Sequence, residues 1–398
     1  TVTPTVNNNT TILTYTEFLS MMRMSLKKLP LVATNRNVSI GRRYDTLTFI
    51  SRPRSGAKFS NSAMSLMSQS ITNSPSSIFK VDDEVQDAIA RGRPVVALES
   101  TIVAHGMPYP QNLELAFEVG TILRQHGVIP ATVAIRDGIC KVGIPKIELE
   151  DLAKAGEEGR AEKCSTRDIP LIVAASRNCP DNNAVETKSR PVVWGATTVA
   201  ATMKLAYLAG IATFVTGGTG GVHRGGEDTM DISADISELA QTPVVVVSAG
   251  VKSILDIKRT LEVLETNSVP TVAWKTDEFP AFFSPSSGVP CPVRVDSAET
   301  VAGAYWAARQ LNMTQGMLVA VPNNDPAGKN VEENIRIALK EAEDRRILGK
   351  DVTPFILKTV AERTGGDSLR SNMELVRNNA RVGAAISKSI AETKPRIS

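Results

Sequence analysis

The chain has 398 residues, of which 42% are hydrophobic and 22% charged, as is typical of globular proteins. Its net charge is +3, from 45 basic and 42 acidic residues, so its composition does not indicate nucleic-acid binding. No apolar run approaches the roughly 18 residues that a membrane-spanning helix needs. The four cysteines lie far apart without a CxxC pair, and only three histidines are present. This excludes an HExxH zinc site and leaves a hard, oxygen-ligated metal as the kind to expect.

The first 76 residues differ in composition from the rest of the chain. Residues 1–80 contain two acids, Glu17 and Asp45, against ten Lys and Arg, and Ser and Thr are abundant. A basic, hydroxyl-rich, acid-poor leader resembles an organellar transit peptide. We therefore expect a mitochondrial or plastid protein whose leader takes no part in the fold, with a peroxisomal or cytoplasmic location as the alternative. Residues 393–398 form a tail that does not end in an SKL-type signal.

Strands and helices alternate from residue 77 onward. In the first half we expect helices over 81–91, 112–125 and 199–209, and strands over 95–98, 131–135 and 171–175. In the second half we expect strands over 211–216, 244–248, 269–274 and 318–321, and helices over 253–265, 298–311, 331–346, 354–364 and 368–390. Short apolar strands are typical of a sheet buried on both faces. The sequence predicts an α/β fold, with a central, largely parallel sheet flanked by helices on both faces, in a single domain over 77–392.

One segment looks foreign to this pattern. Residues 179–194, with the sequence CPDNNAVETKSRPVVW, are mostly polar and contain two prolines. They interrupt the passage from an apolar segment to the helix that follows residue 197. A loop of this length is unusual inside a compact α/β unit.

Active sites of open α/β sheets form at the carboxyl ends of the strands, so the residues at these ends are the first candidates. Glu99 directly follows the apolar strand at 95–98. A carboxyl group in this place is partly desolvated, which raises its pKa and suits general acid–base chemistry. The alternative is a helix cap or a surface acid.

A glycine-rich segment follows the strand at 211–216. Six glycines fall between residues 217 and 226, and His223 and Arg224 add positive character. Backbone N–H groups of such a segment can approach an anion closely. The segment matches neither GxGxxG nor GxxxxGK[ST], so it does not indicate a nucleotide site of those kinds. A flexible loop is the alternative.

Three acids come next, and a lysine follows the strand at 244–248. Asp228, Asp231 and Asp235 are spaced to share one face of a helix, where Mg²⁺ or Mn²⁺ would relieve their repulsion; helix capping is the alternative. Lys252 is expected at the start of the next helix, where the dipole and apolar surroundings disfavour its charged form. A neutral lysine can form a Schiff base with a sugar carbonyl carbon. A solvated first-turn lysine is the alternative.

Longer stretches of the sequence resemble those of a known family. They include ALESTIVAHGMPYPQN, PATVAIRDG, GATTVAATM, TGGTGGVHRGGEDTMDISADISEL, VVVVSAGVKSILDI and ERTGGDSLRSNMELVRNNA. The chain resembles the pseudouridine-5′-phosphate glycosidases, also called the indigoidine synthase A-like family, densely and in order over 77–392. The resemblance implies reversible cleavage of the C–C glycosidic bond of pseudouridine 5′-phosphate to uracil and ribose 5-phosphate. It also implies one Mn²⁺ per subunit and a homotrimer.

The resemblance also implies roles for individual residues. Lys252 of SAGVKS would attack C1′ of the ribose and open the ring, and Glu99 of ALEST would protonate the leaving uracil carbon. Asp231 of TMDISAD would bind Mn²⁺, with water in the other positions. The implied substrate-binding residues are Lys163, which contacts phosphate, and Val199, His223, Ser233, Ala234, Asp235 and Asn372.

The chain departs from the family at residues 179–194. Family members run directly from the preceding segment into an Asn-GATT turn, whereas here 16 residues separate Asn178 from Gly195. We expect the insertion to loosen or block the pocket. Two other interpretations stay open: a catalytically impaired splice-variant subunit that co-assembles with intact chains, and a Schiff-base enzyme that acts on another sugar phosphate.

Overall fold

The computed structural model describes residues 78–177, 194–328, 330–347 and 352–395, and all that follows concerns these ranges. The predicted leader, residues 179–193 of the predicted insertion and the last three residues of the tail lie outside them. In the described part, no helix has both the length and the apolar character needed to cross a membrane.

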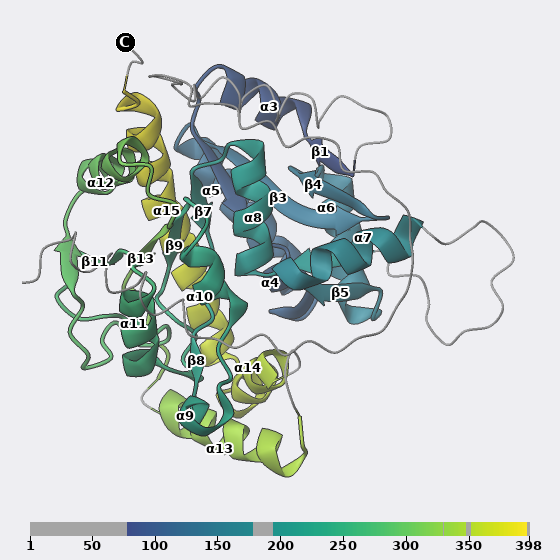
Figure 1. Cartoon of the computed structure of the whole chain (residues 1–398). Helices are drawn as coiled ribbons and strands as arrows, with labels where there is room; N and C mark the ends of the chain where they lie inside the picture. The colour runs from purple at the N-terminus through teal and green to yellow at the C-terminus, as the bar shows by residue number, and fades with distance from the viewer. Residues whose placement is uncertain (1–77, 178–193, 329, 348–351, 396–398) are drawn as a thin grey trace, which may run out of the picture. The chain divides into compact units, whose positions relative to one another are not determined.

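An eleven-stranded, largely parallel sheet lies at the centre of the fold (Figure 1). Nine of its strands follow one another, in spatial order, as β1 (Phe79–Val81), β4 (Ile139–Val142), β3 (Ile129–Arg136), β2 (Val95–Leu98), β7 (Thr213–Val215), β9 (Val245–Ser248), β13 (Met317–Ala320), β11 (Thr271–Trp274) and β12 (Val293–Val295). From β3 through to β12, every neighbouring pair in this order is parallel. The predicted fold class is confirmed.

The sheet divides at β3, which is eight residues long. Its first half pairs in parallel with β2, and its second half pairs antiparallel with β4 and with β6 (Trp194–Thr197). β6 pairs in turn with β5 (Ala161–Cys164), in parallel. The prediction missed β1, β4, β5 and β6, because they are short and most of them contain charged residues, so they lack a clear apolar run.

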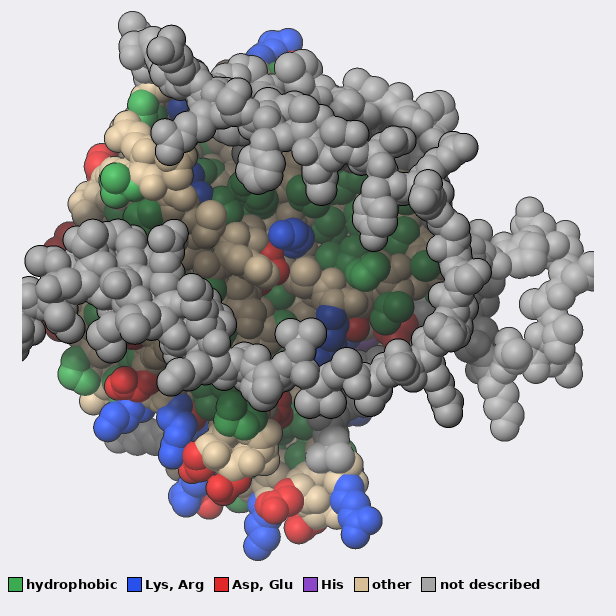
Figure 2. All heavy atoms as spheres, in the orientation of Figure 1, with side chains coloured by type: hydrophobic (Ala, Val, Ile, Leu, Met, Phe, Trp, Pro, Cys, Tyr) green, Lys and Arg blue, Asp and Glu red, His purple; other side chains and the backbone are tan. Residues whose placement is uncertain are grey.

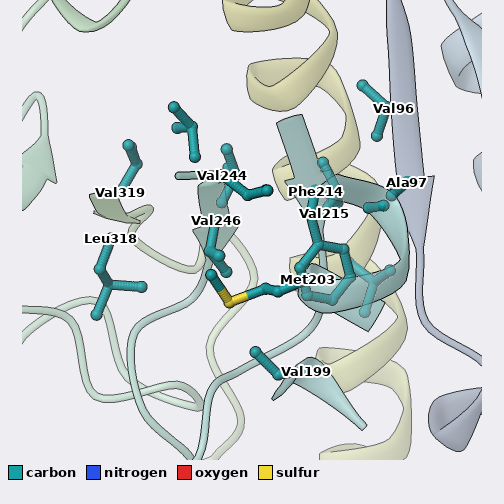
Figure 3. Packing of buried hydrophobic residues seen from close by; sticks show 14 of the residues in the cluster. Val96, Ala97, Val199, Met203, Phe214, Val215, Val244, Val246, Leu318 and Val319 are labelled. Atoms are coloured by element: carbon teal, nitrogen blue, oxygen red, sulfur yellow. The ribbon is translucent and has the colours of Figure 1, made fainter. Parts of the chain in front are cut away.

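Helices cover both faces of the sheet. In chain order they are α3 (Asp83–Ala90), α4 (Thr101–His105), α5 (Gln111–Gln125), α6 (Lys146–Glu157), α7 (Ile169–Arg177), α8 (Val199–Ala209), α9 (Gly226–Thr229), α10 (Ala234–Leu239), α11 (Ile257–Thr266), α12 (Ala298–Gln310), α13 (Val331–Asp344), α14 (Val352–Arg363) and α15 (Asp367–Glu392). On one face, Met203 of α8 lies beside Phe214 and Val246 (Figure 3). On the other face, Gly383 of α15 lies against Val215, so close that a Cβ on this glycine would come within 2.2 Å of the valine side chain.

Hydrophobic and charged side chains gather in different regions of the described surface. On the face shown in Figure 2, hydrophobic side chains gather around α7 and α8, and the side chain of Leu171 in α7 is well exposed. Basic and acidic side chains are mixed along the edge that contains α13. The charges on this edge therefore alternate in sign rather than forming one basic field.

Two predicted elements are wrong in type or extent. The apolar run at 171–175, predicted as a strand, belongs to the helix α7, in which Ile172 and Val173 face the core and Leu171 faces outward. A short apolar run cannot distinguish the two structures by periodicity alone. The helix predicted from residue 253 begins only at Ile257, because Asp256 caps it by accepting a hydrogen bond of 3.0 Å from the Arg259 N–H.

Candidate active site

The candidate site forms where the carboxyl ends of β2, β7 and β9 lie side by side. Leu98 in β2 pairs with Val215 in β7, which pairs with Val247 in β9. Glu99 and Thr216, the residues after β2 and β7, are therefore level with each other. The Thr216 hydroxyl donates a hydrogen bond to the Glu99 carboxylate.

Glu99 is a buried acid with an altered pKa. Glu99 is only 7% exposed, and this burial raises the pKa of its carboxyl group. The positive charges of Lys252 and Lys163 and the Thr216 hydrogen bond oppose the rise, whereas the negative charge of Asp235 adds to it. The desolvation expected from the sequence is present, and it favours a carboxyl group that can hold a proton and donate it.

The residues after Glu99 fix its position between the two parts of the sheet. The Ser100 hydroxyl accepts a hydrogen bond of 2.7 Å from the Thr197 N–H, and the Thr101 hydroxyl donates one of 3.0 Å to the Ala196 carbonyl. Both partners belong to β6. The Glu-Ser-Thr sequence therefore places one acid at the site and uses the next two side chains as anchors.

Lys252 reaches the same place through a turn after β9. Its N–H donates to the Thr219 carbonyl at 3.0 Å, and its carbonyl accepts from the Leu255 N–H at 2.9 Å. Gly250 allows this turn, since its φ is +82° and a Cβ would lie 2.7 Å from the Pro280 carbonyl. The predicted place at the start of a helix is wrong, because α11 begins only at Ile257, so the helix dipole gives no reason for lysine reactivity here.

Most of the predicted site residues line one cavity of about 410 Å³, which we call the main cavity. The predicted residues on its wall are Glu99, Lys163, His223, Asp231, Ser233, Ala234, Asp235 and Lys252. Val199 is not among them, because its side chain is buried in the core, as Figure 3 shows, and its neighbour Thr198 lines the cavity instead. The elements that supply the wall are far apart in the sequence, but the sheet brings them together.

A smaller cavity of about 50 Å³, the side cavity, adjoins the main one. The two share Glu99, Thr101, Lys163, Lys252 and Thr353. The side cavity is also lined by Asn372, which is buried and whose Oδ1 has no hydrogen-bond partner in the described part of the chain. A buried carbonyl oxygen without a partner is costly, so the Asn372 Oδ1 is available to pair with a donor of a ligand or a water.

The three acids of the predicted helix face do not share a helix. Asp228 lies in α9, which ends at Thr229, and Met230 then adopts a left-handed φ of +55°. Asp231 follows outside any helix, and α10 begins three residues later with Ser233 as its N-cap. The predicted continuous face is therefore wrong: Asp231 lines the main cavity, and Asp228 does not.

Asp235 is the most constrained of these acids. One carboxylate oxygen accepts a hydrogen bond of 2.9 Å from the Ala200 N–H, and the other accepts one of 2.8 Å from the Gly220 N–H. It therefore joins the beginning of α8 to the glycine-rich segment. A Cβ on Gly220 would lie 2.1 Å from the Ser233 hydroxyl, so this glycine is needed for close packing.

Two backbone N–H groups of the glycine-rich segment are taken up within the protein, so they are not free for the predicted anion cradle. The Gly220 N–H is used by Asp235, and the Thr219 N–H donates to the Gly250 carbonyl at 3.0 Å. Arg224 does not line the main cavity. Its guanidinium donates instead to the Ser253 carbonyl at 3.0 Å and to Glu332 at 2.9 Å. Packing, rather than anion binding, accounts for the glycines that these contacts involve.

His223 and Asp231 form a pair on the cavity wall, with the His223 Nδ1 3.8 Å from an Asp231 carboxylate oxygen. Burial lowers the pKa of His223, the Asp231 charge opposes this, and Lys163 and Lys252 add to it. The described residues contain no group of three acids, histidines or cysteines that could hold a metal. The half-exposed Asp231 carboxylate nevertheless fits a hard divalent cation that keeps most of its water ligands.

Comparisons with known proteins identify the family of this chain. The family model described as "Indigoidine synthase A like protein" matches residues 84–389. The chain belongs to the indigoidine synthase A-like family. It is 44% identical to a pseudouridine-5′-phosphate glycosidase of Arabidopsis thaliana over 84% of this chain and 97% of that protein. It is 46% identical to one of Escherichia coli K12, over 78% of this chain and 95% of that protein.

Two solved structures share the fold. The prealnumycin C-glycosynthase, solved in complex with ribulose 5-phosphate, is 35% identical with a TM-score of 0.69, over 80% of this chain and 99% of that one. An indigoidine synthase A-like protein of Thermotoga maritima is 33% identical with a TM-score of 0.66, over 79% of this chain and 96% of that one.

Several residues on the cavity walls were missed by the sequence analysis. Thr101, Arg167 and Thr353 line the main cavity, and His105 lines the side cavity. Thr101 follows a strand end beside Glu99, a position that offered a signal. Thr353 belongs to α14, far along the chain, and no local pattern marks it.

Proposed function

We propose that this enzyme cleaves the C–C glycosidic bond of pseudouridine 5′-phosphate, reversibly, to give uracil and ribose 5-phosphate. The observation that supports this most is the pairing of a buried acid, Glu99, with an amine, Lys252, at the junction of two cavities. The curated relatives named for this activity, which are matched over almost their full length, support it as well.

A C–C glycosidic bond has no leaving heteroatom to protonate, so the usual pair of carboxylates would not suffice. In our proposal the Lys252 amine forms a bond to C1′ while the C1′–O4′ bond breaks and O4′ takes a proton. The nitrogen lone pair then expels the uracil carbon, which accepts a proton from Glu99, and an iminium remains at C1′. Water hydrolyses the iminium, releases ribose 5-phosphate and restores the lysine.

Asn372 in the side cavity suits one edge of the base. Uracil has an imide N–H between two carbonyl groups, and the carboxamide of Asn372 can pair with such an edge. The position of Glu99 and Lys252 on both cavities would then place the scissile bond at their junction. Asp231, with water, would hold Mn²⁺, whose charge would offset negative charge in the main cavity.

Two experiments test the proposal. Incubation of the purified chain with pseudouridine 5′-phosphate and Mn²⁺ should release uracil, and no release would contradict the proposed function. Borohydride reduction in the presence of ribose 5-phosphate should attach a pentose phosphate to Lys252, located by peptide mass spectrometry. Lys252→Ala should remove the adduct and the turnover, and an adduct on another lysine would contradict the mechanism.

A second candidate substrate is another sugar phosphate that forms a Schiff base. The solved C-glycosynthase that shares this fold was bound to ribulose 5-phosphate, which favours a pentose phosphate of some kind. Product analysis with pseudouridine 5′-phosphate and with ketose and aldose phosphates offered separately distinguishes the two substrates.

Assembly and location complete the proposal. We propose a homotrimer, as the resemblance implies, and a mitochondrial or plastid protein, as the composition of the leader implies. Light scattering measures the mass of the assembly. Fusion of residues 1–76 to a fluorescent protein shows where the leader directs it.

A further inference from the structure

Glu99 lines a third cavity besides the main and the side cavity. This third cavity, which we call the inner cavity, has a volume of about 30 Å³ and lies among β2, α5 and α15. Most of its wall is apolar, with side chains such as Leu115 and Val376. Thr216 lines the inner cavity but neither the main nor the side cavity. Thr216 therefore lies on the side of Glu99 that faces the protein interior, away from the proposed substrate.

Contacts with neighbouring elements fix Thr216 in place. Its N–H donates to the Val247 carbonyl of β9 at 3.0 Å, and its carbonyl accepts a hydrogen bond of 2.8 Å from the Asn379 side chain of α15. The residue is only 2% exposed. Its hydroxyl has a single proton, which it donates to the Glu99 Oε1. A donor held in this way can also hold the acid that it binds.

This hydrogen bond determines which oxygen of Glu99 can carry the acidic proton. The Glu99 Oε1 accepts from Thr216, so the proton of the carboxyl group belongs on Oε2. Glu99 also lines the main and the side cavity, and Thr216 lines neither of them. Oε2 is therefore the oxygen that is left for the substrate.

We propose that Thr216 is a positioning residue for the proton donor, because its hydroxyl holds Oε1 of Glu99 on the interior side and directs the proton on Oε2 to the uracil carbon. This rests on the proposed function. In the step, the Oε2–H bond breaks, and a C–H bond forms at the uracil carbon with the electron pair of the C1′–C bond. The negative charge left on the carboxylate is shared with Oε1, where the Thr216 hydrogen bond becomes charge-assisted and therefore stronger.

The test compares Thr216→Val and Thr216→Ser with a matched control, Thr213→Val. Valine replaces the hydroxyl of threonine by a methyl group, whereas serine keeps the hydroxyl. Thr213 lies in the same strand, β7, is 1% exposed, and has a buried hydroxyl without a hydrogen-bond partner in the described part of the chain. If Thr216→Val does not fold, Thr216→Ala removes the same hydroxyl without adding volume.

The first measurement is uracil release from pseudouridine 5′-phosphate. We expect kcat to fall about 10-fold or more in Thr216→Val, as for loss of a hydrogen bond to a charged group. KM should change little, because Thr216 lines neither substrate cavity. Thr216→Ser and Thr213→Val should both keep a kcat close to that of the parent.

A pH profile separates this role from a packing role. The Thr216 hydrogen bond favours the carboxylate and so lowers the pKa of Glu99, and its loss should raise this pKa. The limb of the kcat profile that Glu99 sets should therefore move to higher pH in Thr216→Val and stay in place in Thr216→Ser and Thr213→Val. Every variant retains the titratable groups that act on Glu99 or share its cavities. These are Lys163, Lys252, Asp235, His105 and His223.

A kcat and a pH profile of Thr216→Val that equal those of Thr213→Val would overturn the inference, and so would a loss of kcat that serine does not restore. Urea unfolding at several pH values measures the effect on Glu99 without turnover. The fall in stability with rising pH should extend to higher pH in Thr216→Val than in Thr213→Val. If it does so but the parent releases no uracil, the proposed function fails while the effect of Thr216 on Glu99 stands.

Discussion

At the scale of single residues, the site depends on a buried acid with a raised pKa. Burial raises the pKa of Glu99, and neighbouring charges reduce this effect without reversing it. The folded chain therefore binds a proton at Glu99 at pH values where the unfolded chain has lost it. Such a group lowers the free energy of unfolding as the pH rises.

This leads to a prediction for Glu99→Gln. Below the ordinary pKa of 4.5, Glu99 is protonated in both the folded and the unfolded chain, so its ionisation does not change the free energy of unfolding. Above that pH, the free energy of unfolding falls until the pH passes the raised pKa of the folded chain. The stability of Glu99→Gln relative to the parent should therefore increase with pH over this window, while uracil release is lost. Urea unfolding at several pH values measures this, with the exposed Glu114→Gln as control. Parallel stability curves for Glu99→Gln and the parent would contradict the prediction.

Asp231 gives a second prediction at this scale. Because few protein ligands are available, Asp231→Ala should weaken Mn²⁺ binding and lower activity together, and a chelator should lower the activity of the parent. Asp228→Ala, in the exposed helix α9, is the matched control and should change neither. Calorimetric titration with Mn²⁺ reports binding independently of turnover. Full activity of the parent in excess chelator would exclude a metal role.

At the scale of elements, short turns between strands and helices position the site. The sequence predicted the strands β2, β7, β9, β11 and β13, because each is mostly apolar. It therefore placed Glu99 and Lys252 at one edge of the sheet. It did not predict the break between α9 and α10, since the left-handed Met230 has no glycine signature. Nor did it find Thr353, since no sequence pattern links α14 to the sheet.

Glycine substitutions test this account of the turns. Gly220→Ala should destabilise the chain by about 1–3 kcal/mol, the usual cost of overpacking, because the new methyl group meets the Ser233 hydroxyl. Gly303→Ala is the matched control: Gly303 lies in α12 with no atom within 4 Å of the new Cβ. It should stabilise the chain by about 0.5–1 kcal/mol, as alanine does in a helix. Unfolding in guanidinium measures the free energy of unfolding of both variants. An unchanged free energy of unfolding in Gly220→Ala would show that the glycine-rich segment can shift to make room for the methyl group.

At the scale of the whole molecule, the connection from α7 to β6 joins two parts of the main cavity wall. α7 ends at Arg177, and β6 begins at Trp194, the last residue of the predicted insertion. Trp194 is fully buried, and its indole N–H donates to Asp151 at 2.9 Å. A deletion that keeps this core residue therefore spans 179–193.

Removal of this segment should change activity more than stability. Shortening a loop changes its closure entropy only slightly, about 0.6 kcal/mol per halving, whereas a shift of about 1 Å at a reacting centre can cost on the order of a hundredfold in rate. We expect deletion of 179–193 to raise kcat/KM and leave the melting temperature nearly unchanged. Deletion of 179–194 should lower the melting temperature, because Trp194 is lost. Equal kcat/KM in the parent and the shorter deletion would show that the insertion is harmless.

The helix α15 adds a consequence for the order of synthesis. The Asn379 side chain donates to the carbonyl of Thr216, the residue whose hydroxyl bonds Glu99, at 2.8 Å. Asn372 of the same helix lines the side cavity. The pocket is therefore complete only after the ribosome has synthesised α15. Nascent chains that already contain both Glu99 and Lys252 would have the reacting groups but no finished pocket. Catalysis would then begin only after α15 has been made and has packed against the sheet, which makes the activity a reporter of that step of folding.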